Sequence, residues 1–402
     1  MPVARRSISP KEAGMIVIEH GQMVEAVTKQ PILPTNLPHL HDNDNPLWTG
    51  PCAEGPLGGI TQSMLVRFLS CRERFRIKYV MGLEPHPKWN HRIGYGNMWH
   101  VCEEHHAARN PWNMELTRHV NEQLRLYPLQ RDEITKWYRV CQVQFQEYIK
   151  YWADHTDVVN CKPLMQEQVF DVPYALPSGR VVRLRGKFDS VDLIDGGVWL
   201  QENKTKGDID KVQVERQLKF DLQTMVYLIA LDECKGLGED IRTPKWTRDW
   251  IHPIRGVRYN VVRRPLSGGV GNIRQHAAKT TKNKFTPAET DDEFYERLRR
   301  DYIAADPDYW FFRVRSEVGD RDIQVFRDTC LDPLLETVCW WYDDIVGAEW
   351  QTSDYCPPMN YRTPFGVYSS LEEGGSTEYD AYLATGSEAG LKRVDTLFTE
   401  LQ

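Results

Sequence analysis

The stretch that most constrains this chain is residues 197–210, which read GVWLQENKTKGDID. Its apolar start, from Val198 to Leu200, predicts a buried strand that runs directly into a carboxylate and an amine. Side chains alternate along a strand with a period of two, so Glu202 and Lys204 share a face with Leu200. Placing these charges at the end of an apolar face is costly unless they are paired or used. The pattern therefore predicts either a functional site or a surface ion pair at a fraying strand end.

A second carboxylate is expected beside this face. Asp189 lies in the preceding strand-like run, RGKFDSVDLI, which a short DGG turn joins to the stretch above. Neighbouring strands would bring it close to Glu202, where two carboxylates repel unless a divalent cation lies between them. Oxygen ligands select a hard ion, so Mg²⁺ or Mn²⁺ is expected rather than Zn²⁺. Lys204 could then orient or deprotonate a water and neutralise charge on a phosphoryl oxygen. Asp192 points to the other face and is expected to be structural.

The order of the expected elements predicts an α/β fold with helical elaborations at both ends. Helices are expected from about 61 to 154, then strands over 164–176, 180–194 and 197–206, a crossover helix over 211–234, a strand over 255–265, and helices near 291–305 and 325–346. The predicted organisation is 1–60 loop-rich, 61–160 helical, 161–270 the catalytic core, and 271–402 a C-terminal helical region with an irregular tail after 350.

Composition narrows the setting of the protein. The net charge of -7 over 402 residues gives no global sign of a polyanionic partner. Nine cysteines without a CxxC pair indicate reduced thiols, which predicts a cytoplasmic protein. The sequence has no run of about 18 apolar residues and no apolar core of a signal peptide near its start. Neither a membrane span nor secretion is therefore expected.

Four short motifs occur once each and in a fixed order. They are Gly96–His100 (GxxxH), Gly186–Asp189 (GxxD), Glu202–Lys204 ((D/E)xK) and Gln223–Tyr227 (QxxxY). With them, roughly residues 61 to 265 resemble the PD-(D/E)XK nuclease superfamily, particularly its RecB-like and Cas4-like exonuclease branch. The resemblance implies a restriction-endonuclease-like core, with a mixed sheet flanked by helices. It also implies a Mg²⁺-dependent deoxyribonuclease, expected to be an exonuclease of recombination, repair or phage DNA processing.

The resemblance also implies roles for single residues. The expected metal ligands are His100, Asp189, Glu202 and the backbone carbonyl of Asn203. The expected catalytic group is Asp189, Glu202, Lys204, Gln223 and Tyr227, the last two contacting the DNA strand or steadying the lysine. Taken alone, His100 would better fit a satisfied core histidine, and it is the GNMWH context that favours a ligand. Tyr227 could equally pack into the core with Gln223 at its rim. Glu167 matches an acidic position of relatives and could lie in or around the metal site.

Basic residues are expected to form a DNA surface despite the acidic net charge. The candidates are Arg72, Arg74, Arg185, Lys187, Arg263 and Arg264. The alternative for each basic run is a solvated face. The expected partner is DNA, either single-stranded or at duplex ends. The chain has no GxxxxGK[ST] pattern, so a partner helicase or recombinase would have to supply any motor.

Many members of the resembled branch hold an iron–sulfur cluster with four cysteines that converge on one point. Cys71 occupies the first of these places, whereas only Cys356 lies in the corresponding C-terminal segment. An iron–sulfur cluster is therefore not expected. Two other functions stay open: a catalytically inactive relative that binds DNA or a partner protein, and an enzyme of unrelated chemistry on the same core.

Overall fold

The computed structural model describes residues 16–19, 22–25, 46–70, 72–212, 221–234, 253–266, 273–281, 284–347 and 377–401. The chain divides into two compact units, each built from segments distant in the sequence. Unit 1 comprises Met1–His86, Pro173–Arg185 and Asp328–Gln402; unit 2 comprises Pro87–Val172 and Gly186–Arg327. The division into four consecutive segments, 1–60, 61–160, 161–270 and 271–402, stays a prediction.

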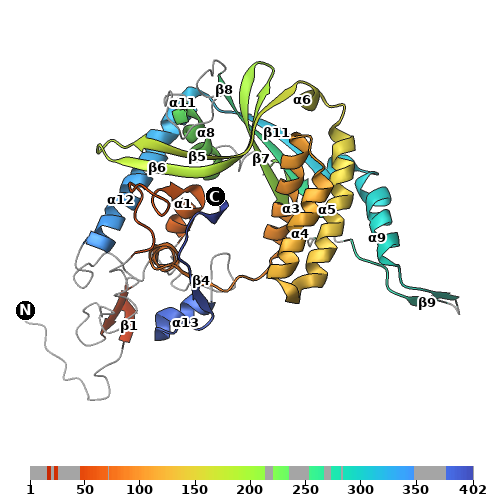
Figure 1. The fold of residues 1–402 in the computed structure, drawn as a ribbon, viewed down its shortest axis with the longest axis horizontal. Helices are drawn as coiled ribbons and strands as arrows, with labels where there is room; N and C mark the ends of the chain where they lie inside the picture. Colours follow the sequence, from red (N-terminus) through yellow and green to blue (C-terminus); the bar gives the residue numbers. More distant parts are fainter. Residues whose placement is uncertain are drawn as a thin grey trace, which may run out of the picture. The chain divides into compact units, whose positions relative to one another are not determined.

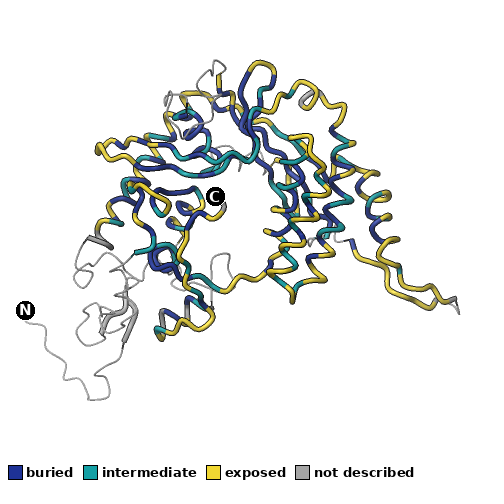
Figure 2. The backbone as a smooth tube through the Cα atoms, in the orientation of Figure 1, coloured by how far each residue is buried: buried dark blue, intermediate teal, exposed yellow. Residues whose placement is uncertain are grey.

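Three long helices form a layer of unit 2: α3 (His91–Ala107), α4 (Trp112–Leu126) and α5 (Arg131–Trp152) (Figure 1). Asn90 begins α3, because its side chain accepts a hydrogen bond from the free N–H of Arg92 at 2.8 Å. Aromatic residues fill the space between the helices, with Trp99 edge-on to Phe145 at 5.0 Å between ring centroids. Each of the three helices has exposed residues on its outer face and buried residues on the face towards the other helices (Figure 2). This layer fixes the register of α3, which carries His100.

The central sheet contains β3 (Ile60–Thr61), β5 (Cys161–Ala175), β6 (Val181–Ile194), β7 (Gly197–Lys206), β8 (Ile254–Arg263) and β11 (Phe311–Glu317). Its order is β11-β8-β7-β6-β3, and β5 also pairs with β6. The β6–β7 pair is antiparallel, whereas β7 and β8 are parallel and are separated in sequence by α8 (Leu222–Cys234). A mixed sheet with flanking helices confirms the predicted fold class.

Within the range 211–234 expected for the crossover helix, α8 takes Leu222–Cys234 and residues 211–212 are also helical, whereas 213–220 lie outside the described residues. Asp221 caps the start of α8, because its carboxylate accepts a hydrogen bond from the backbone N–H of Thr224 at 3.2 Å. An aspartate in that position is a favoured helix N-cap.

The edge strand β11 was not expected. It pairs antiparallel with β8 along its whole length, from Phe311 opposite Val262 to Glu317 opposite Gly256. Its sequence, FFRVRSE, mixes arginines with apolar residues and lacks the continuous apolar run of a central strand. An edge strand can carry charge in this way because only one of its sides is paired. The central sheet therefore includes residues 311–317, for which the sequence predicted no strand.

The remaining described elements of unit 2 are short. They are η3 (Pro128–Gln130), α6 (Thr156–Val159), β9 (Lys279–Thr281), β10 (Lys284–Thr286), α9 (Asp291–Arg297) with its continuation η5 (Leu298–Ile303), α10 (Pro307–Trp310) and α11 (Asp320–Phe326). Thr290 begins α9 with a reciprocal cap, in which Glu293 also bonds back to the Thr290 backbone.

Unit 1 is organised around an aromatic cluster. Phe75 contacts the rings of Trp48, Phe68 and Trp341 at centroid distances of 5.2, 5.5 and 5.5 Å. The elements are β1 (Ile16–Glu19), β2 (Gln22–Glu25), α1 (Gln62–Ser70), α2 (Arg72–Phe75) with η2 (Arg76–Val80), β4 (Leu83–Pro85), η6 (Arg327–Leu331) leading into α12 (Asp332–Gly347), α13 (Thr377–Thr385) and β12 (Leu391–Arg393).

The tail after residue 350 is not irregular throughout, contrary to the sequence prediction. Helix α13 buries Tyr379 and Tyr382, and β12 pairs antiparallel with β4. Tyr379 also donates a hydrogen bond to the backbone carbonyl of Leu83 at 2.9 Å. Tyr379 and Tyr382 are three positions apart and so share a helix face. This spacing predicts a helix, but the Gly- and Ser-rich composition of the tail obscured it. No helix in the described ranges is long and apolar enough to cross a membrane.

Candidate active site

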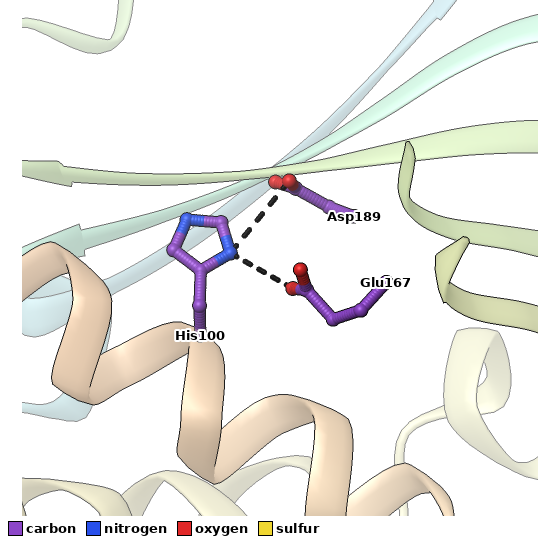
Figure 3. Close-up of side chains that lie close together, drawn as sticks. All are labelled: His100, Glu167 and Asp189. Atoms are coloured by element: carbon purple, nitrogen blue, oxygen red, sulfur yellow. Dashed lines mark hydrogen bonds and ion pairs between the residues drawn. The ribbon is translucent and has the colours of Figure 1, made fainter. Parts of the chain in front are cut away.

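Three potential metal ligands from three elements of unit 2 lie together. The ring Nδ1 of His100, on α3, lies 3.2 Å from Glu167 Oε1 of β5 and 3.6 Å from Asp189 Oδ1 of β6 (Figure 3). One ligand atom from each residue lies within 4.8 Å of the others. Glu167 has a φ of 47° within its strand, a conformation that side chains with a Cβ rarely adopt. Such local strain is typical of functional sites.

Asp189 also contacts the neighbouring strand. Its Oδ2 accepts a hydrogen bond from the backbone N–H of Asn203 at 2.8 Å. This contact follows from the antiparallel register, in which Ser190 lies opposite Gln201. One carboxylate oxygen is thus held by β7, while the other faces His100. The expected proximity of Asp189 to the Glu202–Lys204 motif is present in the structure.

Glu202, Lys204 and Gln223 form a triangle of hydrogen bonds. Glu202 Oε2 accepts from Lys204 Nζ and from Gln223 Nε2, both at 2.9 Å. Gln223 Oε1 accepts from Lys204 Nζ at 2.7 Å. Glu202 is fully buried, so the predicted fraying surface pair is not what the structure shows. The QxxxY glutamine therefore contacts the lysine directly.

The second oxygen of Glu202 has no protein partner among the described residues. Glu202 Oε1 is buried, yet no hydrogen-bond donor reaches it. Leaving a buried carboxylate oxygen unsatisfied costs several times more than a typical hydrogen bond gains. A hard cation beside the neighbouring carboxylates and His100 would satisfy it. The donor set of this site therefore fits a divalent metal ion.

The electrostatics of these groups agree with that fit. Burial raises the pKa of Glu202 to about 7, although the Lys204 ammonium opposes the shift. Burial disfavours the charged form of His100, but Asp189 and Glu167 outweigh it and raise the pKa of His100 to about 9. Without a metal, His100 therefore carries the positive charge that the surrounding carboxylates require. Metal binding would have to displace that proton.

These two shifts predict how the stability of the metal-free protein depends on pH. Both Glu202 and His100 bind protons more tightly in the folded chain, so the free energy of unfolding falls as pH rises. The Glu202 contribution is lost between about 4.5 and 7, and the His100 contribution between about 6.5 and 9. Urea unfolding in EDTA, compared between wild type and Glu202→Gln, measures the first contribution. A difference between the two proteins that does not change over pH 4.5 to 7 would contradict the prediction.

Tyr227 belongs to an aromatic cluster beside the site. Its ring lies edge-on to Phe170 and Phe188, at centroid distances of 5.4 and 5.8 Å. Burial raises the pKa of its hydroxyl far above the ordinary value, so it stays protonated. Of the two residues of the QxxxY motif, Tyr227 packs against aromatic rings, whereas Gln223 bonds to Lys204. Their contact with DNA stays a prediction.

The two motif glycines, Gly96 and Gly186, differ in how much space a side chain would have at their positions. A Cβ on Gly186 would lie 2.5 Å from Phe170 Cζ and 3.3 Å from Tyr227 Cε1, whereas a Cβ on Gly96 would meet only Thr205 Oγ1 at 3.6 Å. We expect Gly186→Ala to destabilise the fold by about 1–3 kcal/mol through overpacking. Gly96→Ala, in a helix, should instead stabilise it by about 0.5–1 kcal/mol. Chemical denaturation compares the pair; equal effects would contradict this assignment.

The basic residues of unit 2 that were expected to bind DNA have protein partners. Lys187 Nζ lies 2.7 Å from Glu167 Oε2, which links it to the candidate metal site. Arg263 pairs with Asp208, and its guanidinium lies 4.0 Å from the centre of the Tyr309 ring. Arg264 is 9% exposed and donates to the backbone carbonyl of Thr205 at 2.7 Å. Their DNA contacts stay predictions, and Lys187 is the one adjacent to the site.

The other three candidates belong to unit 1. Arg72 lies 4.9 Å from the centre of the Phe68 ring, and Arg74 lies 5.6 Å from that of Tyr379. Arg185 donates to the carbonyls of Pro56 and Gly58 at 3.0 Å. Each of these arginines thus has a structural contact within its own unit. Whether they also bind phosphate stays a prediction.

Two features of the site were not assigned by sequence reasoning. Glu167 had a signal, the acidic position on the preceding strand, but was not included among the ligands. The second feature, the hydrogen bonds that hold Asn203, had no signal in the sequence. The side-chain oxygen of Asn203 accepts from Asn260 Nδ2 at 2.9 Å, and Asn260 also donates to Glu103 at 3.0 Å. This network lies across three elements, so no local pattern reveals it. It holds the strand at the residue whose carbonyl is the expected ligand.

The expectation about an iron–sulfur cluster cannot be located in the fold, because Cys71 and Cys356 lie outside the described residues.

Comparison with known families agrees with this geometry. The family model of the PD-(D/E)XK nuclease superfamily matches residues 60–315, which is more than half of the chain. The chain belongs to this superfamily. A search of curated proteins finds no match. The matched range contains the four motifs, α3, β5–β8 and nearly all of the unexpected strand β11.

Proposed function

We propose that this protein is a metal-dependent nuclease that hydrolyses phosphodiester bonds in DNA. The observation that carries the proposal is the cluster of His100, Glu167 and Asp189, whose possible ligand atoms lie within 4.8 Å of one another. Glu202 lies close enough for the charges of Asp189 and His100 to influence its pKa, and its buried Oε1 has no hydrogen-bond partner among the described residues. A structural ion pair would satisfy both oxygens of the glutamate. Here one oxygen is held by Lys204 and Gln223, and no residue in the described part of the chain donates to the other.

The proposed roles follow from this arrangement. Asp189, Glu202, His100 and the carbonyl of Asn203 would hold the cation, with Glu167 next to His100 as a further ligand. When bound, the cation would supply Lewis-acid polarisation of the phosphate and of a water. Lys204 would orient the attacking water and stabilise negative charge that develops on the phosphoryl oxygens. Gln223 would fix the direction of the Lys204 ammonium, because its Oε1 accepts a hydrogen bond from Lys204 Nζ.

The finer assignment rests on the four motifs. They favour a RecB-like or Cas4-like deoxyribonuclease that uses Mg²⁺ or Mn²⁺ and acts on single strands or duplex ends. Exonuclease action in recombination, repair or phage DNA processing belongs to this proposal, as do a helicase or recombinase partner and a cytoplasmic location. Phosphate contacts from Lys187 and the five candidate arginines would increase the affinity for DNA, and this contribution would fall as the salt concentration rises.

The test uses the full chain and four DNA substrates: end-labelled duplex, single strand, closed circle and nicked circle. Each is incubated with Mg²⁺, Mn²⁺, Ca²⁺ or EDTA. The proposal expects cleavage of linear DNA with Mg²⁺ or Mn²⁺ and none with EDTA. Cleavage of closed circles would replace the exonuclease assignment with an endonuclease one. DNA binding without cleavage under every metal condition would favour a catalytically inactive relative and would overturn the proposal.

A further inference from the structure

Two cysteines of unit 1 lie in contact outside the candidate active site. The Sγ atoms of Cys52, in the turn after Trp48, and Cys339, on α12, are 3.7 Å apart. Cys52 is exposed to solvent, whereas Cys339 is buried. The pair thus combines a thiol that a small reagent can reach with a second thiol that the same reagent cannot.

The backbone before Cys52 is seated on the helix that carries Cys339. Gly50 has a φ of +107°, and a Cβ there would lie 2.6 Å from Cε1 of Tyr342. The hydroxyl of Tyr342 donates to the carbonyl of Trp48 at 3.1 Å. Tyr342 follows Cys339 by three positions, so the two share a face of α12. Packing therefore holds the turn against the helix face that presents Cys339.

The backbone on both sides of Cys52 is also tied to a strand. Arg183 Nη1 donates to the carbonyls of Ala53 at 3.0 Å and Gly55 at 2.8 Å. The backbone N–H of Arg183 donates to the carbonyl of Pro51 at 3.0 Å. Cys52 is therefore flanked by residues whose carbonyls are fixed. The short sulfur–sulfur distance is built into the fold on two sides.

We propose that Cys52 and Cys339 form a reversible intramolecular disulfide, a modification site that responds to peroxide. The Cys52 thiolate would attack one oxygen of hydrogen peroxide, giving a sulfenic acid and releasing hydroxide, which becomes water. The Cys339 sulfur would then attack the Cys52 sulfur, lose its proton, and expel the sulfenic oxygen as a second water. Two thiols and one peroxide thus yield one disulfide and two waters. The sulfur atoms need to approach from 3.7 Å to about 2.05 Å.

The surroundings of Cys52 favour the first step. The hydrogen bond from Cys339 lowers the pKa of the Cys52 thiol to about 7; partial burial opposes this, and Arg180 adds to it. The acidic groups that face the pair are Asp343 and Glu336, and both raise the pKa. Asp343 is itself paired with Arg180 at 2.7 Å. A large fraction of Cys52 is therefore thiolate at neutral pH, which is the reactive form.

The chain contains a matched pair that should not react. Cys102 and Cys141 of unit 2 have Sγ atoms 3.9 Å apart, but both are fully buried. Burial raises the pKa of Cys102 well above the ordinary value, so it stays a thiol. The two pairs have similar sulfur–sulfur distances and differ in access. They separate the effect of geometry from that of exposure within one protein.

The test treats the reduced full-length chain with a small excess of hydrogen peroxide, alkylates it with iodoacetamide and maps the peptides without reduction. We expect a Cys52–Cys339 peptide that has lost two hydrogens and is released by dithiothreitol, with Cys102 and Cys141 alkylated only after unfolding. The oxidised protein should also melt at a higher temperature. Cys52→Ser should abolish both effects, and Cys330→Ser should keep them.

Three results would overturn the proposal. Peroxide could leave Cys52 as an oxidised acid without linking it to Cys339. It could link Cys52 to another thiol of the chain, or it could link Cys102 to Cys141 as fast as it links the proposed pair.

In the Cys339→Ala variant, Cys52 should react with iodoacetamide more slowly at pH 7, because the hydrogen bond that stabilises its thiolate is gone. An unchanged rate would also contradict the proposal.

Discussion

Replacing Lys204 with alanine is expected to slow DNA cleavage by roughly 10²- to 10⁴-fold while DNA binding changes little. The Lys204 ammonium donates to both Glu202 and Gln223, so it is held in one position next to the candidate metal ligands. Alanine removes the group that would orient the water and stabilise the phosphoryl charge. Single-turnover cleavage with protein in excess and Mg²⁺ measures the chemical step. Binding measured with Ca²⁺ separates it from affinity.

The matched control is Lys206→Ala, two residues along the same strand. Lys206 lies on β7 after the candidate site, and its backbone carbonyl accepts from the N–H of Arg264 at 2.7 Å. Because alanine keeps that backbone contact, the Lys206 variant should cleave within a few-fold of the wild-type rate. If both variants cleave like wild type, the role proposed for Lys204 is wrong. If both lose cleavage equally, the effect comes from lost positive charge along the strand.

Asp189→Asn is expected to weaken binding of Mn²⁺ by about 10²-fold or more and to reduce cleavage correspondingly. The change keeps the shape of the side chain and its contact with the backbone N–H of Asn203, but it removes the negative charge that faces His100. Calorimetric titration with Mn²⁺ measures affinity without any substrate. The asparagine variant should remain folded, because its side-chain oxygen can still accept from the backbone N–H of Asn203 and Glu167 still lies 3.2 Å from His100.

Asp192→Asn provides the opposite control on the same strand. Asp192 is 2% exposed and pairs with Arg258, which is 3% exposed. Removing one charge of a buried pair leaves the other uncompensated and costs about 3 kcal/mol or more of stability. Asp192→Asn should therefore unfold at lower denaturant concentration while Mn²⁺ affinity stays close to wild type. A result in which Asp192→Asn loses metal binding and Asp189→Asn does not would contradict the assignment of the two faces.

Local pattern was sufficient for the centre of the fold. The period of two along β7 placed Glu202 and Lys204 on one face, and the hydrogen bond between them shows that they share it. The same period placed Asp192 on the face opposite Asp189, where it pairs with Arg258. The DGG turn fixed the antiparallel pairing of β6 and β7. These features depend on neighbours in the sequence, for which strand geometry alone gives the answer.

Elements at the edges of the fold were predicted less well. β11 carries arginines because only one of its edges is paired, so it lacks the apolar run of a central strand. α13 and β12 are stabilised by contacts with η2 and β4 rather than by strong local preference. In each case the partner lies far away in the sequence. Tertiary packing decides such segments and overrides composition.

By itself, the sequence determined the alternation of strands and helices, the superfamily, and the residues Asp189, Glu202 and Lys204 as one group. It could not determine that one oxygen of Glu202 is buried with no partner in the described part of the chain, that Glu167 turns towards His100, or that Asn260 donates a hydrogen bond to Asn203. The first set follows from periodicity and spacing within one or two adjacent strands. The second set depends on distances between atoms of α3, β5, β7 and β8, which exist only once the chain has folded.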